Sequence, residues 1–217
     1  MLNMYALVVL VFQGQFLSAS IAHEVFPDDI FCGIGADVVF YFPVYRQVMA
    51  WIGTFPASRK NISTILDSGC PCTVLPGGIA EMYLVNDKEE AVYLRKRRNT
   101  VKAALQEGAH IVPAFFYGNT CLFHQVGTDK GTDSFLSRIS RKLRASIVFY
   151  TGRNYLPVPL RHPLKMAIGE PVLLEGGPNP NPSDADIDAL LERVVVAIQE
   201  LYEKEKPSWE TRPLIVH

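Results

Sequence analysis

A short apolar run that ends in a proline and two glycines constrains the fold of this chain most strongly. Residues 72–75, Cys-Thr-Val-Leu, have the length and apolar character of a buried strand, and Pro76, Gly77 and Gly78 predict the turn that ends it. Glu81 follows just past this end. Ligands of α/β proteins bind in the crevice outside the carboxyl ends of the strands, and adjacent glycines let the backbone turn sharply and let another group approach closely. We therefore expect a binding site at this edge.

Strand-like and helix-like segments alternate on both sides of this turn. Further strands are predicted at residues 38–42, 109–117, 147–150 and 164–168, and helices at 43–52, 59–68, 99–106, 133–144 and 183–201. Residues 54–58 are expected to form a loop, 91–94 a short strand that pairs with 82–85 or crosses the sheet edge, and the tail from 207 an extended segment. Pro113 indicates a strand end or an edge strand. The pattern predicts an α/β fold, a single domain with a mixed, mostly parallel sheet flanked by helices.

The first 22 residues are apolar but interrupted by polar side chains. The uninterrupted run, residues 5–12, is too short for a membrane span, which needs roughly 20 residues. A signal peptide remains an alternative, although the positive charge that begins such peptides is missing. We predict a buried helix of the domain here, and no other stretch is a candidate for a transmembrane helix.

Composition excludes several classes of protein. With 48% hydrophobic and 20% charged residues, the 217-residue chain is globular and long enough for one full domain. The 21 basic and 22 acidic residues give a net charge of −1, so charge gives no case for a nucleic-acid partner. The four cysteines lack the spacing of a disulfide scaffold or a zinc site, so we expect buried thiols in a reducing compartment and no bound metal.

A basic cluster precedes the helix predicted at residues 99–106. Arg95, Lys96, Arg97 and Arg98, with Lys102 one turn later, place cations where the helix dipole is already positive. A bound anion would relieve this repulsion, so the cluster favours a phosphate-bearing ligand. A solvated basic face or a contact with anionic lipid is the alternative.

Catalytic motifs of the common hydrolases, nucleotide-binding proteins and metalloproteases are absent from the sequence. The five histidines are expected to be structural or to face solvent. Glu81 could bind a ligand, act as a base or position one. Spacing and composition alone predict an α/β domain with an anion site.

Several blocks, taken together and in order, resemble the diacylglycerol acyltransferase type 2 family. They are residues 38–43 (Val-Val-Phe-Tyr-Phe-Pro), 51–61, 66–69, 74–81 (Val-Leu-Pro-Gly-Gly-Ile-Ala-Glu), 94–102, 107–113, 162–163 and 168–171. The resemblance covers the chain from about residue 37 onward. It implies a glycerolipid-acyltransferase-like fold and an enzyme at the cytosolic face of the endoplasmic reticulum membrane and on lipid droplets. Such an enzyme moves a fatty acyl group from acyl-CoA to the free hydroxyl of diacylglycerol, forming triacylglycerol. Acyl-CoA is a substrate, no cofactor is implied, and a homo-oligomer is left open.

The resemblance also assigns roles to residues. In the family, a His-Pro-His-Gly or Glu-Pro-His-Ser block carries a histidine that takes the proton of the acceptor hydroxyl, and the oxyanion that forms needs nearby donors. Glu81 matches the family's acidic residue and is expected to support catalysis. The residues expected to bind substrate are Arg59, Pro76, Gly77, Gly78, Arg95, Arg97, Arg98 and Lys102.

The sequence departs from the family where the base should be. No His-Pro-His-Gly block occurs, nor the hydrophobic anchor that usually precedes it. Residues 1–7 resemble the continuation after that block, so our hypothesis is that the chain, one acyltransferase domain over residues 1–217, begins directly after the missing motif. A non-catalytic paralogue that binds acyl-CoA or lipid is the alternative from another class. Monoacylglycerol, wax alcohols or sterols are alternative acceptors.

Overall fold

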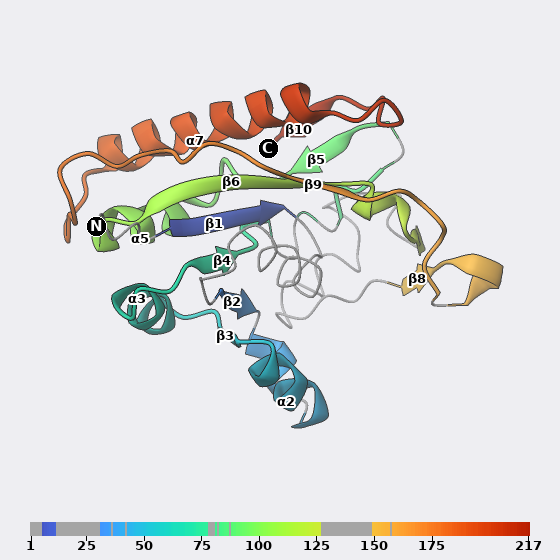
Figure 1. The fold of residues 1–217 in the computed structure, drawn as a ribbon, viewed down its shortest axis with the longest axis horizontal. Helices are drawn as coiled ribbons and strands as arrows, with labels where there is room; N and C mark the ends of the chain where they lie inside the picture. Colours follow the sequence, from blue (N-terminus) through green and yellow to red (C-terminus); the bar gives the residue numbers. More distant parts are fainter. Residues whose placement is uncertain are drawn as a thin grey trace.

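A six-stranded sheet forms the centre of the protein, which is described here from a computed structural model. The structure describes residues 6–11, 31–35, 37–41, 43–77, 81, 83–86, 88–126, 149–156 and 158–217. The strand order is β3 (Thr54–Pro56), β2 (Cys32–Gly35), β4 (Cys72–Val74), β1 (Ala6–Val11), β6 (His110–Tyr117) and β9 (Lys165–Ile168), as Figure 1 shows. All neighbours pair in parallel except β9, which is antiparallel to β6. The predicted α/β fold with a mixed, mostly parallel sheet is confirmed.

The apolar runs at residues 72–74 and 111–117 form interior strands, as their composition favours. Every residue of β4 and all of β6 except His110 are buried, which explains why neither strand alternates apolar with polar residues. The prediction that Pro113 marks an edge or a strand end is wrong for β6, which lies between β1 and β9. Pro113 is tolerated because its carbonyl faces Gly169, whose N–H lies 2.8 Å away, just past the end of β9. The missing N–H of Pro113 therefore falls where the ladder already stops.

Three helices pack in series beside the sheet. α3 (Arg59–Asp67) contacts α5 (Arg98–Glu107), and α5 contacts α7 (Asp184–Glu205), which also packs on β6. The predicted helix ends are confirmed: Gly69 and Gly108 adopt positive φ after α3 and α5, and Ser183 and Asp186 form a capping box at the start of α7. The stripe predicted on α7 is buried, with Leu190, Val194 and Ile198 each at most 3% exposed.

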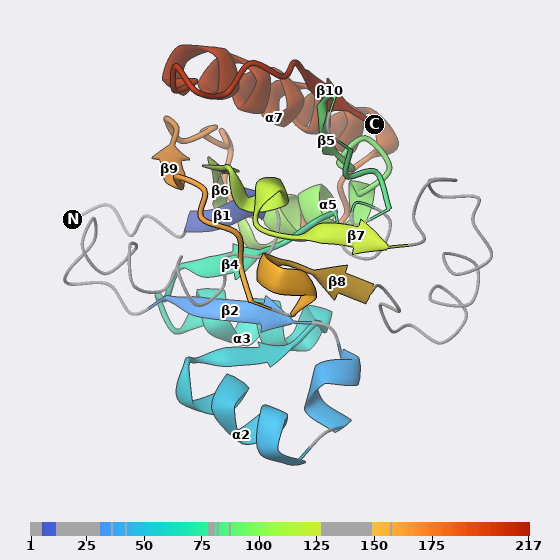
Figure 2. The ribbon, with the colours of Figure 1, turned by 90° about the vertical axis from the view of Figure 1, so that its right-hand side faces the viewer.

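The far end of the sheet carries a short helical unit that the sequence predicted only in part. α2 (Pro43–Trp51) begins at the predicted proline and Gly53 follows it with φ +69°, as expected. The strand predicted at residues 38–42 is instead the 3₁₀ helix η1 (Asp37–Tyr41), and the loop predicted at 54–58 contains β3. β propensity depends on an available neighbour: residues 54–56 pair with β2, whereas residues 37–41 lead directly into a helix. Figure 2 shows α2 and α7 at opposite ends, with the sheet between them.

The N-terminal segment contains a strand, so the helix predicted over residues 1–22 is wrong where the structure describes it. β1 pairs with β4 on one side and β6 on the other, with Leu7 in register with both Cys72 and Ile111. Its sequence, Ala-Leu-Val-Val-Leu-Val, is rich in β-branched residues, and a short apolar run cannot be assigned by periodicity alone. Residues 1–5 and 12–22 lie outside the described part.

Two small sheets flank the main one. β5 (Glu90–Val92) pairs in parallel with β10 (Leu214–Val216), and β7 (His124–Val126) pairs antiparallel with β8 (Phe149–Thr151). The partner of the predicted strand at 91–94 is thus the extended tail and not residues 82–85. Short 3₁₀ turns, η2 (Asn119–Cys121) and η4 (Arg153–Tyr155), complete the described connections. The helix predicted at 133–144 lies outside the described residues, and no helix within them has the length and apolar character needed to cross a bilayer.

Candidate active site

The candidate site lies where the central parallel strands end. β4 ends at Val74, which is in register with Val9 of β1, so the turn after β4 lies next to the end of β1. β2 and β3 end at the same edge, at Gly35 and Pro56. This is the edge at which α/β sheets bind ligands. Pro76 and Gly77, which follow β4, therefore lie at this edge, and binding of a ligand there stays a prediction.

Glu81 is a buried carboxyl group at this edge. The residue is 2% exposed, and its Oε2 accepts a hydrogen bond of 2.9 Å from the backbone N–H of Tyr93. Burial raises the pKa of Glu81 to about 7, while the Tyr93 N–H and the charge of Arg97 act to lower it and Glu90 acts to raise it. A carboxyl group with this pKa can hold or release a proton near neutral pH.

Gly77 is required by the close approach of Glu81. A Cβ atom at position 77 would overlap the carboxyl group of Glu81, so only glycine leaves room for it. Pro76 is buried beside it. The expectation that a glycine here admits another group is therefore met for Gly77, and that group is the chain's own acid. Gly78 lies outside the described residues.

Arg97 joins the turn to the segment that holds Glu81. Its Nη2 donates to the carbonyl oxygen of Gly77 at 2.6 Å, and its guanidinium carbon lies 5.1 Å from the ring centroid of Tyr93. The Nε atom of Arg97 is buried and has no hydrogen-bond partner among the described residues. Arg97 occupies the N-cap of α5, where no side chain caps the helix. The guanidinium that contacts the turn thus comes from the N-cap residue, at the positive end of the helix.

The other arginines of the basic cluster face a different surface. Nη1 of Arg95 lies 2.7 Å from Glu192, and Arg98 pairs with Asp184 and Asp188 at 3.0 and 2.9 Å. All three acids lie on α7. A phosphate would have to compete with these carboxylates, so the structure separates Arg95 and Arg98 from Arg97. Their role in substrate binding stays a prediction.

The remaining predicted cations are exposed. Lys102 lies on the exposed side of α5, and Lys96 lies with its Nζ 5.7 Å from the Tyr93 ring centroid. Arg59 begins α3, immediately after the end of β3, and so lies at the carboxyl edge of the sheet but on the far side of β2 from β4. The structure therefore brings four of the predicted residues together: Pro76, Gly77, Glu81 and Arg97. The other four predicted cations lie outside this group: Arg59, Arg95, Arg98 and Lys102.

Histidines and metal ligands add nothing to the site in the described part of the chain. His110 Nδ1 accepts the N–H of Leu174 at 3.1 Å, which confirms a structural role. The ring of His162 lies edge-on to Trp209, with centroids 5.2 Å apart, and its Nδ1 lies 2.9 Å from the Pro163 carbonyl oxygen. Over the described residues, no group of three or more His, Cys, Asp or Glu side chains could hold a metal ion.

Sequence analysis missed three residues that shape this site. Tyr93 supplies the N–H that holds Glu81, and Glu90, on the same segment as Tyr93, forms a buried ion pair with Arg212 of the C-terminal tail. Tyr93 could have been suspected from its place in a short strand before the basic cluster. The pair had no local signal, because 122 positions separate its members.

The arrangement can serve a reaction in which a proton and a negative charge move at one place. Glu81 offers an exchangeable proton near neutral pH, and Arg97 with the uncapped start of α5 offers positive charge for an oxyanion or a phosphate. None of the described residues that the structure brings together here, Pro76, Gly77, Glu81 and Arg97, is a serine, threonine or cysteine. The arrangement therefore fits a direct transfer between two bound substrates better than a covalent intermediate on the protein.

Comparison with known proteins agrees with this chemistry. A family model described as diacylglycerol acyltransferase matches residues 15–216. "Diacylglycerol O-acyltransferase 2-like protein 6" of Mus musculus is 26% identical over 185 residues, which is 79% of this chain and 54% of the relative. "2-acylglycerol O-acyltransferase 1" of Bos taurus is 26% identical over 77% of this chain and 52% of its own length. "Diacylglycerol O-acyltransferase 2" of Homo sapiens is 29% identical over 77% and 45%.

The chain thus spans about half the length of the curated relatives it matches. No solved structure matches it.

Proposed function

The chain belongs to the diacylglycerol acyltransferase family, and we propose that it forms the part of an O-acyltransferase that binds acyl-CoA and an acylglycerol at the carboxyl ends of β4 and β1. The favoured acceptor is diacylglycerol, whose free hydroxyl becomes the third ester of triacylglycerol. The observation that carries the proposal is the buried carboxyl of Glu81, whose pKa is raised to about 7, beside the guanidinium of Arg97.

The chemistry assigns a supporting role to Glu81. In acyl transfer the acceptor oxygen loses a proton, attacks the thioester carbonyl and expels the CoA thiolate, and the carbonyl oxygen carries negative charge on the way. Glu81 would orient the base that takes the proton, or would accept that proton from the base. A carboxyl group with a pKa near neutral can exchange a proton in this way. Arg97 and the start of α5 would stabilise the negative charge.

The sequence has no His-Pro-His-Gly block, so Glu81 and Arg97 are proposed to assist a base and not to replace one. The test is an acyl-transfer assay on membranes from cells that make no triacylglycerol of their own. One arm uses the chain as printed and another uses the longest reading frame of its gene. Labelled acyl-CoA and diacylglycerol should give labelled triacylglycerol in the arm with the longest reading frame, and Glu81→Gln or Arg97→Gln should lower the rate on the order of a hundredfold.

The absent histidine block specifically favours a second candidate, a paralogue that binds acyl-CoA or lipid without turnover. Calorimetric titration of acyl-CoA would separate the two. Saturable binding by the protein from the longest reading frame, with no product from any acceptor, would overturn the enzymatic proposal and support the binding one.

The same assay also tests which alcohol accepts the acyl group. The relatives are named for both diacylglycerol and 2-acylglycerol as acceptors, at 26–29% identity. Parallel assays with diacylglycerol, monoacylglycerol, a long-chain alcohol and a sterol should give the highest kcat/KM with diacylglycerol. A clear preference for another alcohol would replace it.

Membrane association at the endoplasmic reticulum or a lipid droplet is part of the proposal, and α2 supports it. Val44 and Trp51, one heptad apart on this helix, are 81% and 75% exposed, and Tyr41 of η1 is 79% exposed. Exposed aromatic and aliphatic side chains on one face, with Arg46 close by, suit the interface of an anionic bilayer. Trp51→Ser with Val44→Ser should reduce co-sedimentation with phosphatidylserine-containing vesicles severalfold. Val196→Ser on α7, 42% exposed, is the matched control and should have no effect.

A further inference from the structure

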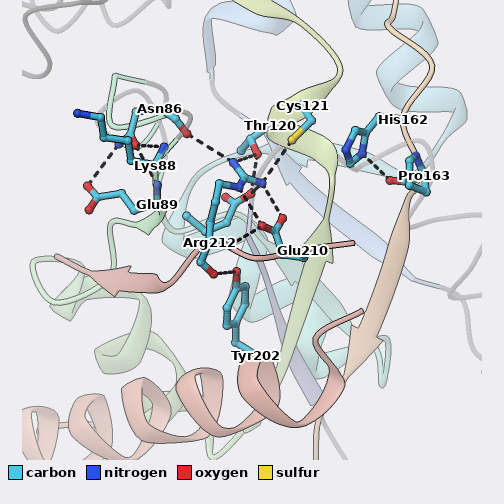
Figure 3. A network of polar contacts seen from close by, with 11 residues as sticks. Asn86, Lys88, Glu89, Thr120, Cys121, His162, Pro163, Tyr202, Glu210 and Arg212 are labelled. Atoms are coloured by element: carbon cyan, nitrogen blue, oxygen red, sulfur yellow. Dashed lines mark hydrogen bonds and ion pairs between the residues drawn. The ribbon is translucent and has the colours of Figure 1, made fainter. Parts of the chain in front are cut away.

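A buried network of charges lies behind the segment that holds Glu81. The guanidinium of Arg212 forms ion pairs with Glu90 and with Oε2 of Glu210, the latter at 2.6 Å, and its Nη1 donates to Oγ1 of Thr120 at 3.1 Å. The side chains of Arg212, Glu90 and Glu210 are 12%, 5% and 3% exposed. Figure 3 shows Arg212 at the centre of these contacts, between Thr120, Cys121 and Glu210. Two carboxyl groups share one buried cation, so loss of Arg212 leaves both without compensation.

This network connects the small β5–β10 sheet to the end of the main sheet. Glu90 begins β5 and accepts a hydrogen bond of 2.6 Å from Thr120 of η2, which follows β6. Arg212 precedes β10, and Leu214 is in register with Glu90. β5 is hydrogen-bonded to β10 and not to the main sheet in the described structure. The side chain of Glu90 therefore ties β5 to the end of β6, in addition to the buried packing of Ala91 and Val92.

The same segment continues directly into the site. Tyr93 follows β5 at once and its N–H holds Oε2 of Glu81, and Arg97 then reaches the carbonyl of Gly77. A shift of β5 would move the donor of Glu81 and the cation of the site together. Displacements on the order of 1 Å are enough to lower catalytic rates strongly.

Glu90 is also electrostatically coupled to Glu81. Burial, and then the negative charge of Glu90, raises the pKa of Glu81, whereas the Tyr93 N–H and Arg97 lower it. Arg212 offsets the charge of Glu90, and it acts with Thr120 to lower the pKa of Glu90 against the effect of burial. The charged groups of the described residues that act on Glu81 are thus Arg97 and Glu90.

We propose that Arg212 and Glu90 are positioning residues for acyl transfer: their buried ion pair holds β5 so that Tyr93 and Arg97 present a donor and a cation to Glu81. The inference rests on the proposed function of that site. It assigns a role to a residue near the C-terminal strand that touches neither Glu81 nor Gly77.

The test compares three variants in the acyl-transfer assay, expressed from the longest reading frame of the gene. Arg212→Gln should lower kcat on the order of tenfold or more, with KM for acyl-CoA within about twofold, because the turn that meets the substrate is intact. Arg212 lowers the pKa of Glu90, so without Arg212 the buried Glu90 holds its proton and no longer raises the pKa of Glu81. Arg212→Gln should therefore move the pH–rate profile to lower pH. Glu90→Gln, which keeps the shape of the side chain, should move the profile in the same direction, and the double variant should show no further shift.

A purely structural role would lower activity without moving the pH–rate profile of either variant to lower pH, and that result would overturn the proposal. Lys165→Gln is the control, because it breaks an ion pair of 3.1 Å with Glu205 that shares no residue with this network. If Arg212→Gln fails to fold, the isosteric Glu90→Gln still tests the proposal. Its pH–rate profile should move to lower pH, and an unmoved profile would overturn the proposal.

A second readout separates this inference from the proposed function. The pH dependence of urea unfolding reports the titration of Glu81 without any substrate. Glu90→Gln should lower the pH at which the free energy of unfolding changes half-way. This effect should vanish when Glu81 is also replaced by Gln. If no protein shows turnover but the midpoint moves, the acyl-transfer proposal fails while the coupling stands. If turnover is normal and neither profile responds, the positioning role is wrong.

Discussion

Glu81 experiences opposing influences on its pKa, and burial dominates. Because its pKa in the folded protein, about 7, lies above the ordinary value of 4.5, the protonated form is the one that the fold favours. The stability that this group contributes is complete below pH 4.5 and is lost as pH rises through about 7. The difference corresponds to about 3 kcal/mol.

Substitution of Glu81 by Gln should therefore flatten the pH dependence of stability. We expect urea unfolding of the unmodified chain to show a fall on the order of 3 kcal/mol between pH 4.5 and 8, and Glu81→Gln to remove most of it. Asp67→Asn, a change at an exposed carboxyl on α3, is the control. A curve of unchanged shape in Glu81→Gln would show that this carboxyl does not titrate in the range.

Gly77 allows a second prediction at the scale of one residue. Gly77→Ala places a methyl group where the carboxyl of Glu81 lies, so the acid or the turn must move. Overpacking of this kind costs about 1–3 kcal/mol, and the acyl-transfer rate should fall with it. Gly177→Ala is the control: a Cβ there meets open space, but φ is +76°. It should lower the free energy of unfolding by about 1 kcal/mol through backbone strain and leave the acyl-transfer rate unchanged. Equal rates in the two variants would contradict the assigned packing.

At the scale of elements, the connection between β5 and α5 sends its cations in two directions. Arg95 and Arg98 reach exposed acids on α7, and Arg97 reaches the turn after β4. Exposed pairs contribute little to stability, typically about 0.2–1 kcal/mol each, and salt screens them. The functional weight of the cluster should therefore rest on Arg97.

Paired substitutions test that division. Arg97→Gln should lower kcat/KM for acyl-CoA by at least tenfold, because a buried cation is lost next to Glu81. Arg95→Gln should change kcat/KM less than twofold and stability by under about 1 kcal/mol. Steady-state kinetics with varied acyl-CoA, and urea unfolding, measure both. A larger loss of acyl-CoA affinity in Arg95→Gln would instead support the original assignment of Arg95 to substrate binding.

Element types followed from local pattern more reliably than their partners did. α3 and α5 end at the glycines that predicted their ends, and α7 begins at the predicted Ser183 cap but runs on to Glu205. The strand predicted at residues 38–42 and the loop predicted at residues 54–58 were wrong. Strand formation depends on whether a neighbouring strand is there to accept hydrogen bonds. The helix predicted at the N-terminus failed for the same reason: β1 is a strand because it lies between β4 and β6.

At the scale of the whole molecule, the C-terminal strand β10 stabilises β5, which lies near the middle of the sequence. β10 pairs with β5, and the carbonyl of Pro213 accepts the N–H of Glu90 at 2.9 Å. Removal of residues 207–217 would delete this strand together with Arg212 and leave Glu90 buried without its cation. A buried charge that loses its partner costs about 3–5 kcal/mol.

Deletion of residues 207–217 should accordingly lower the free energy of unfolding by about 3 kcal/mol or more. Hydrogen exchange should show faster exchange of amides in β5 and at Tyr93, whereas amides of β2 and β3, at the other end of the sheet, keep their protection. Unchanged protection of the Tyr93 amide would show that β5 holds its place without the C-terminal strand.

The sequence alone determined the alternation of strands and helices, the helix ends, the turn after β4 and the placement of Glu81 at the carboxyl edge. These depend on hydrophobic runs, caps and glycines within a few residues of one another. Only the tertiary structure decided that Arg97 and not Arg95 or Arg98 faces Glu81, that β1 is central, and that Arg212 supports β5. Such facts depend on contacts between segments that are distant in the sequence: 20 positions separate Arg97 from Gly77, 97 separate Arg95 from Glu192, and 122 separate Arg212 from Glu90. Burial, which only the tertiary structure decides, also raises the pKa of Glu81.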